Sequence, residues 1–170
     1  MNTLNVILII IIILLSLVIA YFYIANNLTE YKIKMELAEK EIQKNVNDKY
    51  TKMKEMQKII NKTLKKKEYL KAFSEIDDSE LSINDLSIKL DESLEIMNAL
   101  KDDHKSLNTD EFNNKLQEIN MIDERIIANK KYYNKTNNLL LKDLKGIKKI
   151  VAKILHISSK SSYEIKEPVE

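Results

Sequence analysis

The chain has 170 residues, of which 44% are hydrophobic and 32% charged, and its formal net charge is +2. Gly146 and Pro168 are its only Gly and Pro, and because turns depend on residues with positive or fixed φ, the composition predicts an all-α fold. It also argues against an enzyme, since without Cys or a glycine-rich loop, and with only His104 and His156, nucleophilic, phosphate-binding and metal chemistry lack their usual residues. We therefore expect no cofactor and no small-molecule substrate.

The N-terminal segment is uncharged through Thr29, and residues 4–25 are almost entirely Ile, Leu, Val and aromatic. A helix of this length reaches about 30 Å, the thickness of the hydrocarbon core of a bilayer. The segment is therefore predicted to be a transmembrane anchor with an aromatic edge at headgroup level. Its marker residues are Val6, Ile12, Val18, Tyr21, Phe22 and Tyr23.

A cleaved signal peptide is the alternative interpretation of this segment. No basic residue precedes the apolar run, the run is long for a signal peptide, and no small-x-small cleavage site follows it, so a retained single-pass anchor is favoured. Basic residues begin at Lys32 and continue with Lys34, Lys40 and Lys44. The positive-inside rule then predicts an external N-terminus and a cytoplasmic body.

The remaining chain divides into three blocks by charge. Lys dominates residues 31–71 and 130–170, whereas acidic residues dominate residues 72–129. Successive antiparallel helices would bring such blocks face to face, but solvated helix faces would show the same pattern, and both interpretations stay open.

Apolar residues from Leu28 onward recur with a period of 3.6, which predicts one straight helix that continues from the anchor to about Lys71. The stripe comprises Leu28, Tyr31, Met35, Ala38, Ile42, Val46, Tyr50, Met53, Met56, Ile60 and Leu64.

Two further helices follow. Ser82 and Asp85 resemble a capping box at the start of the second helix, and Asn108 or Thr109 precedes Asp110 and Glu111 at the start of the third. The second stripe comprises Ile83, Leu86, Leu90, Leu94, Met97 and either Leu100 or His104. The third comprises Phe112, Leu116, Ile119, Ile122, Ile126, Tyr133, Leu140 and Leu144, with a polar layer at Asn129 and at Thr136 or Asn137.

Gly146 is predicted to end the third helix, and residues 147–157 to form a short basic amphipathic helix. Its apolar side is Ile147, Ile150, Val151, Ile154 and Leu155. We favour a role in capping the bundle over one on a lipid surface, because three antiparallel helices would place the end of the third far from the bilayer. The expected division is an anchor at residues 1–25, a helical bundle at 26–157 and a polar tail at 158–170.

Two basic runs form a candidate surface for lipid or for a partner protein. They comprise Lys65, Lys66 and Lys67 after the first helix, and Lys148, Lys149 and Lys153 in the terminal helix. For the run at Lys65 to Lys67, a solvated helix face is the favoured interpretation. With a single Arg in the chain, no nucleic-acid partner is expected.

The order of these features resembles the LemA family of bacterial membrane proteins. The resemblance rests on Tyr21-Phe22-Tyr23-Ile24 at the end of the span, Leu107 to Phe112, Asp123-Glu124-Arg125-Ile126, and Ile150 to Leu155. It implies a membrane-anchored helical bundle with a short external N-terminus and no established biochemical activity.

Two functions follow as hypotheses. The first is a membrane-tethered antiparallel three-helix bundle with a short fourth helix that binds an unidentified membrane or cytoplasmic protein. The second is a peripheral lipid-binding or membrane-shaping module whose basic helices bind anionic headgroups of the bilayer.

Overall fold

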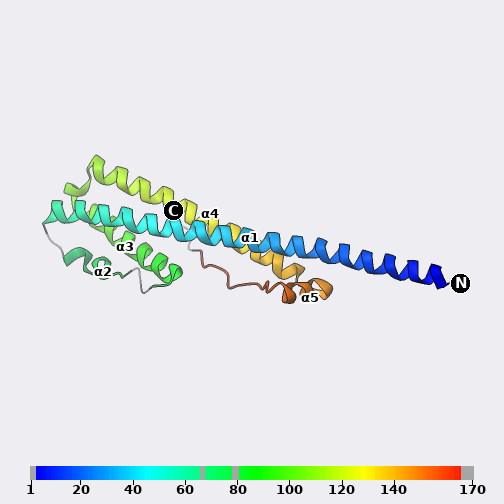
Figure 1. The fold of residues 1–170 in the computed structure, drawn as a ribbon. Coiled ribbons are helices and arrows are strands. Elements are labelled where there is room, and N and C mark those ends of the chain that lie inside the picture. The colour runs from blue at the N-terminus through cyan, green and yellow to red at the C-terminus, as the bar shows by residue number, and fades with distance from the viewer. Residues whose placement is uncertain (1–2, 66–67, 78–80, 166–170) are drawn as a thin grey trace. The chain divides into compact units, whose positions relative to one another are not determined.

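A computed structural model describes residues 3–65, 68–77 and 81–165, and all regular structure in these ranges is helical. This confirms the predicted all-α class. The elements are α1 (Thr3–Leu64), the 3-10 helix η1 (Glu68–Leu70), α2 (Lys71–Ser74), α3 (Ile83–Asp103), the 3-10 helix η2 (Lys105–Leu107), α4 (Asp110–Asp143) and α5 (Gly146–Ile154), as Figure 1 shows.

The chain forms two compact units, and the two longest helices contribute to both. The first unit contains residues 1–38 and 132–162, and the second contains residues 39–131 and 163–170. The expected division at Ala25 and Ile157 concerns the roles of the segments, and it stays a prediction.

The first unit combines the N-terminal part of α1 with the end of α4 and with α5. The Tyr31 hydroxyl donates a hydrogen bond to Asp143 Oδ2 at 3.4 Å, and Leu28, Leu140 and Val151 are buried. Within this unit α4 runs toward the apolar end of α1 (Figure 1). The expectation that the third helix ends far from the anchor is therefore wrong.

The second unit is a three-helix bundle of α1, α3 and α4. Lys49 bonds Asp123 of α4, and Lys52 bonds Glu118, so α1 and α4 are antiparallel. Lys130 of α4 donates to Ser87 of α3, while Lys49 also bonds Asp91 of α3. These contacts make α3 antiparallel to α4, and α3 therefore runs in the same direction as α1.

A return segment explains the direction of α3. Gln57 Nε2 donates to the Ser74 hydroxyl at 2.6 Å, and the Tyr50 hydroxyl donates to the Ile76 carbonyl at 2.8 Å. Residues 68–77 thus run back along α1 before α3 begins. The first helix was predicted to reach about Lys71. Helix α1 instead ends at Leu64, because the backbone of Lys65 adopts φ +55°.

The other helix starts agree with their predicted caps. The Ser82 hydroxyl accepts the Asp85 N–H at 3.2 Å, and the Thr109 hydroxyl accepts the Phe112 N–H at 3.3 Å. Gly146 does not end the third helix. That helix ends at Asp143, and Gly146, with φ +54°, begins α5.

The predicted stripes form the core. The stripe of α1 is buried from Leu28 to Ile60 except for Tyr31, and that residue and Leu64 are half-buried. The buried stripe residues of α3 and α4 are Leu86, Leu90, Leu94, Met97, Leu100, Phe112, Ile119, Ile126, Tyr133 and Leu140.

Candidate membrane-facing site

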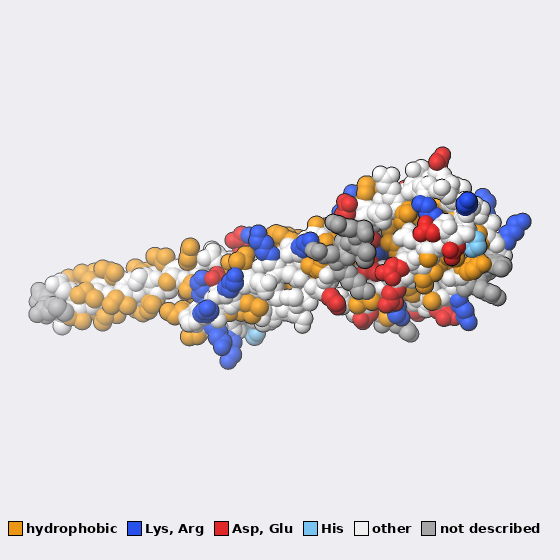
Figure 2. Space-filling model, turned by 180° about the vertical axis from the view of Figure 1, so that it is seen from behind, with side chains coloured by type: hydrophobic (Ala, Val, Ile, Leu, Met, Phe, Trp, Pro, Cys, Tyr) orange, Lys and Arg blue, Asp and Glu red, His pale blue; other side chains and the backbone are white. Residues whose placement is uncertain are grey.

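The apolar segment at the start of α1 is exposed along its length, since every residue from 3 to 20 is exposed. Ile12 is 63% exposed and Val18 is 50% exposed, and no residue of its most apolar window is buried. This helix is long and apolar enough to cross a membrane, although a signal sequence has the same properties. Figure 2 shows apolar side chains over the visible face of the segment and Lys side chains gathered where the segment ends.

An aromatic edge closes the segment. The rings of Tyr21 and Phe22 meet edge to face with centroids 5.7 Å apart, and Phe22 and Tyr23 are exposed. Amphipathic rings of this kind favour the headgroup region. Val6, Ile12, Val18 and the aromatic cluster therefore share one continuous helix, as the anchor prediction requires.

The bundle begins almost directly after this edge. Leu28 is only 1% exposed, and Tyr31 bonds Asp143 at the end of α4. Since a helix rises about 1.5 Å per residue, Leu28 lies about 5 Å and Tyr31 about 9 Å beyond Ala25 along the helix axis. The end of α4 is therefore held close to the predicted membrane surface.

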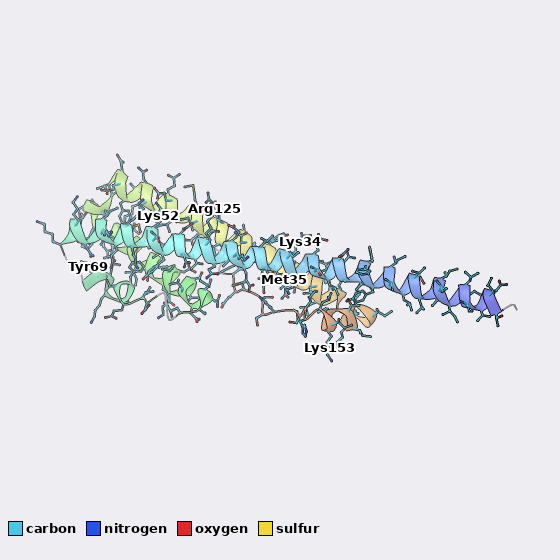
Figure 3. All side chains as sticks on the ribbon, viewed as in Figure 1. Lys34, Met35, Lys52, Tyr69, Arg125 and Lys153 are labelled. Atoms are coloured by element: carbon cyan, nitrogen blue, oxygen red, sulfur yellow. The ribbon has the colours of Figure 1, made fainter. Side chains whose placement is uncertain are left out.

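The terminal helix α5 has three distinct faces. Val151 and Ala152 are buried against the unit, and Lys148 bonds Asp143 at 3.0 Å. A second face carries three exposed side chains at positions i, i+3 and i+7: Ile147 (69%), Ile150 (63%) and Ile154 (60%). Lys149 and Lys153 are exposed on the third face, and Figure 3 shows Lys153 on the side of α5 away from α1. The single apolar side predicted from the sequence is thus divided between packed and exposed residues.

The segment after α5 is hydrogen-bonded to α4 through Asn137, a residue of the predicted polar layer. Asn137, which is buried, donates to the Lys160 carbonyl at 2.7 Å and accepts the Lys160 N–H at 3.1 Å. Thr136 is also buried and donates to the Tyr132 carbonyl, whereas Asn129 is half-buried. A small cavity of about 70 Å³ includes Lys160 in its lining. The lining residues are Lys32, Met35, Glu36, Leu140, His156, Ile157, Ser158 and Lys160.

The two basic runs do not form one surface within either unit. Lys65 is exposed and belongs to the second unit, whereas Lys148, Lys149 and Lys153 belong to the first. Lys66 and Lys67 lie outside the described residues.

The second unit contains a charged cluster that the sequence analysis missed. Lys49 is 1% exposed, and its ammonium lies 2.6 Å from Asp91 Oδ1 and 2.6 Å from Asp123 Oδ1. Burial raises the pKa of Asp123 against the opposing pull of Lys49, and burial lowers the pKa of Lys130, which bonds Ser87 nearby. The sequence held one sign of this burial: Lys49 lies one helical turn from both Val46 and Met53, which belong to the buried stripe.

In this cluster the charges of Lys49 and of the two carboxylates, Asp91 and Asp123, offset one another. The Lys49 ammonium bonds Asp91 of α3 and Asp123 of α4, so one buried cation links three helices. Removing one partner of such a buried group is costly, because it leaves charge uncompensated. Among the described residues no group of three or more His, Asp or Glu side chains is placed to hold a metal ion. No protein-family model, curated protein or solved structure matches the chain.

Proposed function

We propose that this chain is a LemA-like, single-pass membrane protein that works without catalysis, as a scaffold that presents its helical bundle to another protein. The observation that carries the proposal is α1, which runs unbroken from Thr3 to Leu64 through the apolar segment and into both units.

The bundle has the features of a presentation surface. Lys49 and its two carboxylates link three helices from within. On the outside of the second unit, Ile96 of α3 and Met121 of α4 remain exposed. Apolar side chains of this kind form the buried centres of protein interfaces, and Met is enriched there.

The proposed location is the bacterial plasma membrane, with the N-terminus outside and the bundle in the cytoplasm. The charge distribution supports this orientation, because the segment before the span lacks Lys and Arg and Lys32 and Lys34 follow it.

Site-specific photo-crosslinking in living cells tests the partner. A photoreactive amino acid at Ile96 or at Met121 is expected to give an adduct with one defined protein. The adduct should disappear when the span carries Ile12→Arg with Val18→Arg, because the untethered bundle is no longer concentrated at the membrane. Adducts restricted to the chain itself, at both positions, would show that these surfaces bind no partner.

A further inference from the structure

The exposed isoleucines of α5 are the most conspicuous apolar surface in the first unit outside the predicted span. Ile147, Ile150 and Ile154 lie on one helical face, and each is at least 60% exposed. A neighbouring face of α5 is packed against the unit, because Val151 and Ala152 are buried and Lys148 bonds Asp143. The isoleucine face is thus directed outward by the packing of that neighbouring face.

The level of α5 along α1 follows from its connections. Asp143, three residues before α5, bonds Tyr31, about 9 Å beyond the end of the span. After α5 the chain returns to α1, where Ile157, Ser158 and Lys160 line a cavity with Lys32 and Met35. Headgroups extend about 5–7 Å beyond each side of the hydrocarbon core, so Tyr31 lies just outside them. Within this unit α5 lies past the end of α4, on the side of the apolar end of α1 (Figure 1), which brings α5 to the level of the membrane interface.

The backbone before α5 sets its direction. Lys145 is extended and Gly146 has φ +54°, so α5 does not continue the axis of α4. A side chain at Gly146 would meet no atom within 4 Å, and the glycine therefore serves the turn and not the packing. The chain here makes a sharp change of direction next to the predicted membrane surface.

We infer that α5 is an interfacial helix that inserts its isoleucine face at the boundary between headgroups and acyl chains, with Lys149 and Lys153 on anionic lipid phosphates. This inference rests on the membrane anchoring proposed above. Lipid is the occupant because α5 lies beside the apolar end of α1 (Figure 1), and because Lys149 and Lys153, the exposed charged residues of α5, are both cationic. The helix thereby fixes the bundle against the bilayer instead of leaving it on a free tether.

Single-tryptophan fluorescence tests the inference, since the chain contains no Trp. Full-length protein carrying Ile150→Trp is reconstituted into vesicles of phosphatidylglycerol and phosphatidylcholine in which the acyl chains are brominated at a shallow or a deep position. Ile12→Trp serves as the control within the span, and Ile96→Trp, on exposed α3, as the control in the second unit. Flotation of the vesicles reports incorporation separately.

The expected result is that shallow bromines quench Ile150→Trp at least threefold more than they quench Ile96→Trp, and more than deep bromines do. Adding Lys149→Glu and Lys153→Glu should reduce this quenching in anionic vesicles. If Ile12→Trp is quenched and Ile150→Trp is quenched no more than Ile96→Trp, the interfacial assignment is wrong while the anchor stands. A blue-shifted but unquenched Ile150→Trp would assign the face to protein instead. If the protein fails to float and Ile12→Trp is unquenched, the anchor itself is refuted.

Discussion

Replacing Ile12 and Val18 together by Arg is expected to move the protein from the membrane to the soluble fraction. Ile12 is 63% exposed and Val18 is 50% exposed on α1. In a membrane both side chains would therefore contact acyl chains and not protein. An Arg near the centre of a transmembrane helix costs about 2.5–3.5 kcal/mol on insertion scales, and two cost about 5–7 kcal/mol. That is comparable with the total that a span of this composition gains on insertion, at about 0.3–0.6 kcal/mol for each apolar residue.

Alkaline carbonate extraction of cell membranes measures the effect. The unmodified protein should remain in the pellet, and the double Arg variant should appear in the supernatant. Ile12→Leu with Val18→Leu is the matched control, because it changes the same two positions and keeps them apolar. Extraction of the unmodified protein by carbonate would mean that α1 is no anchor.

Lys49→Glu is expected to unfold the second unit. The substitution would place a third carboxylate where Asp91 and Asp123 now share one ammonium, with no cation left between them. Lys49→Met removes the charge alone and should cost about 2–4 kcal/mol. This is less than the 3–5 kcal/mol typical of a broken buried pair, because the two carboxylates are 33% and 26% exposed.

Urea denaturation followed by circular dichroism, in detergent with the full chain, separates this effect from a general loss of charge. Lys52→Met is the control, since Lys52 also bonds a carboxylate, Glu118, but is 34% exposed and should cost at most about 1 kcal/mol. Equal losses for Lys49→Met and Lys52→Met would show that the buried cluster carries no special weight.

The pH dependence of Lys49→Met gives a second signature of the cluster. Without Lys49, burial raises the pKa of Asp123 further above its ordinary value of 3.8. A carboxyl group whose pKa is raised by folding loses stability as the pH increases from its unfolded pKa to its folded pKa. The deficit of Lys49→Met should therefore be smaller at pH 4 than at pH 7.

The features that the sequence predicted correctly are those set by local chemistry. The 3.6-residue stripe of α1, the Ser82 cap of α3 and the Thr109 cap of α4 all depend on residues within one or two helical turns. The candidate membrane span is equally local, because it is recognised from the length and composition of one helix.

The features that the sequence did not predict depend on how the segment after α1 folds back along that helix. The turn after Leu64 has no Gly or Pro, and a Lys with positive φ makes it instead. The hydrogen bond from Tyr50 to Ile76 then folds the segment back along α1, so that α3 runs parallel to it. Within the first unit, the contact of Tyr31 with Asp143 places the end of α4, and with it α5, near the apolar segment of α1, and these two residues lie 112 positions apart in the sequence. The position of α5 was therefore beyond any argument from periodicity.

Cysteine labelling tests the anchored and oriented bundle most directly, because the chain has no Cys of its own. Single variants Asn2→Cys and Ser162→Cys, the latter at an exposed position after α5, are treated with a membrane-impermeant maleimide on intact and on permeabilised cells. We predict that Asn2→Cys labels the full-length protein in intact cells, and that Ser162→Cys labels only after permeabilisation. Labelling of Ser162→Cys in intact cells would contradict the predicted orientation. A shortened, soluble product of Asn2→Cys that carries no label would contradict the anchor.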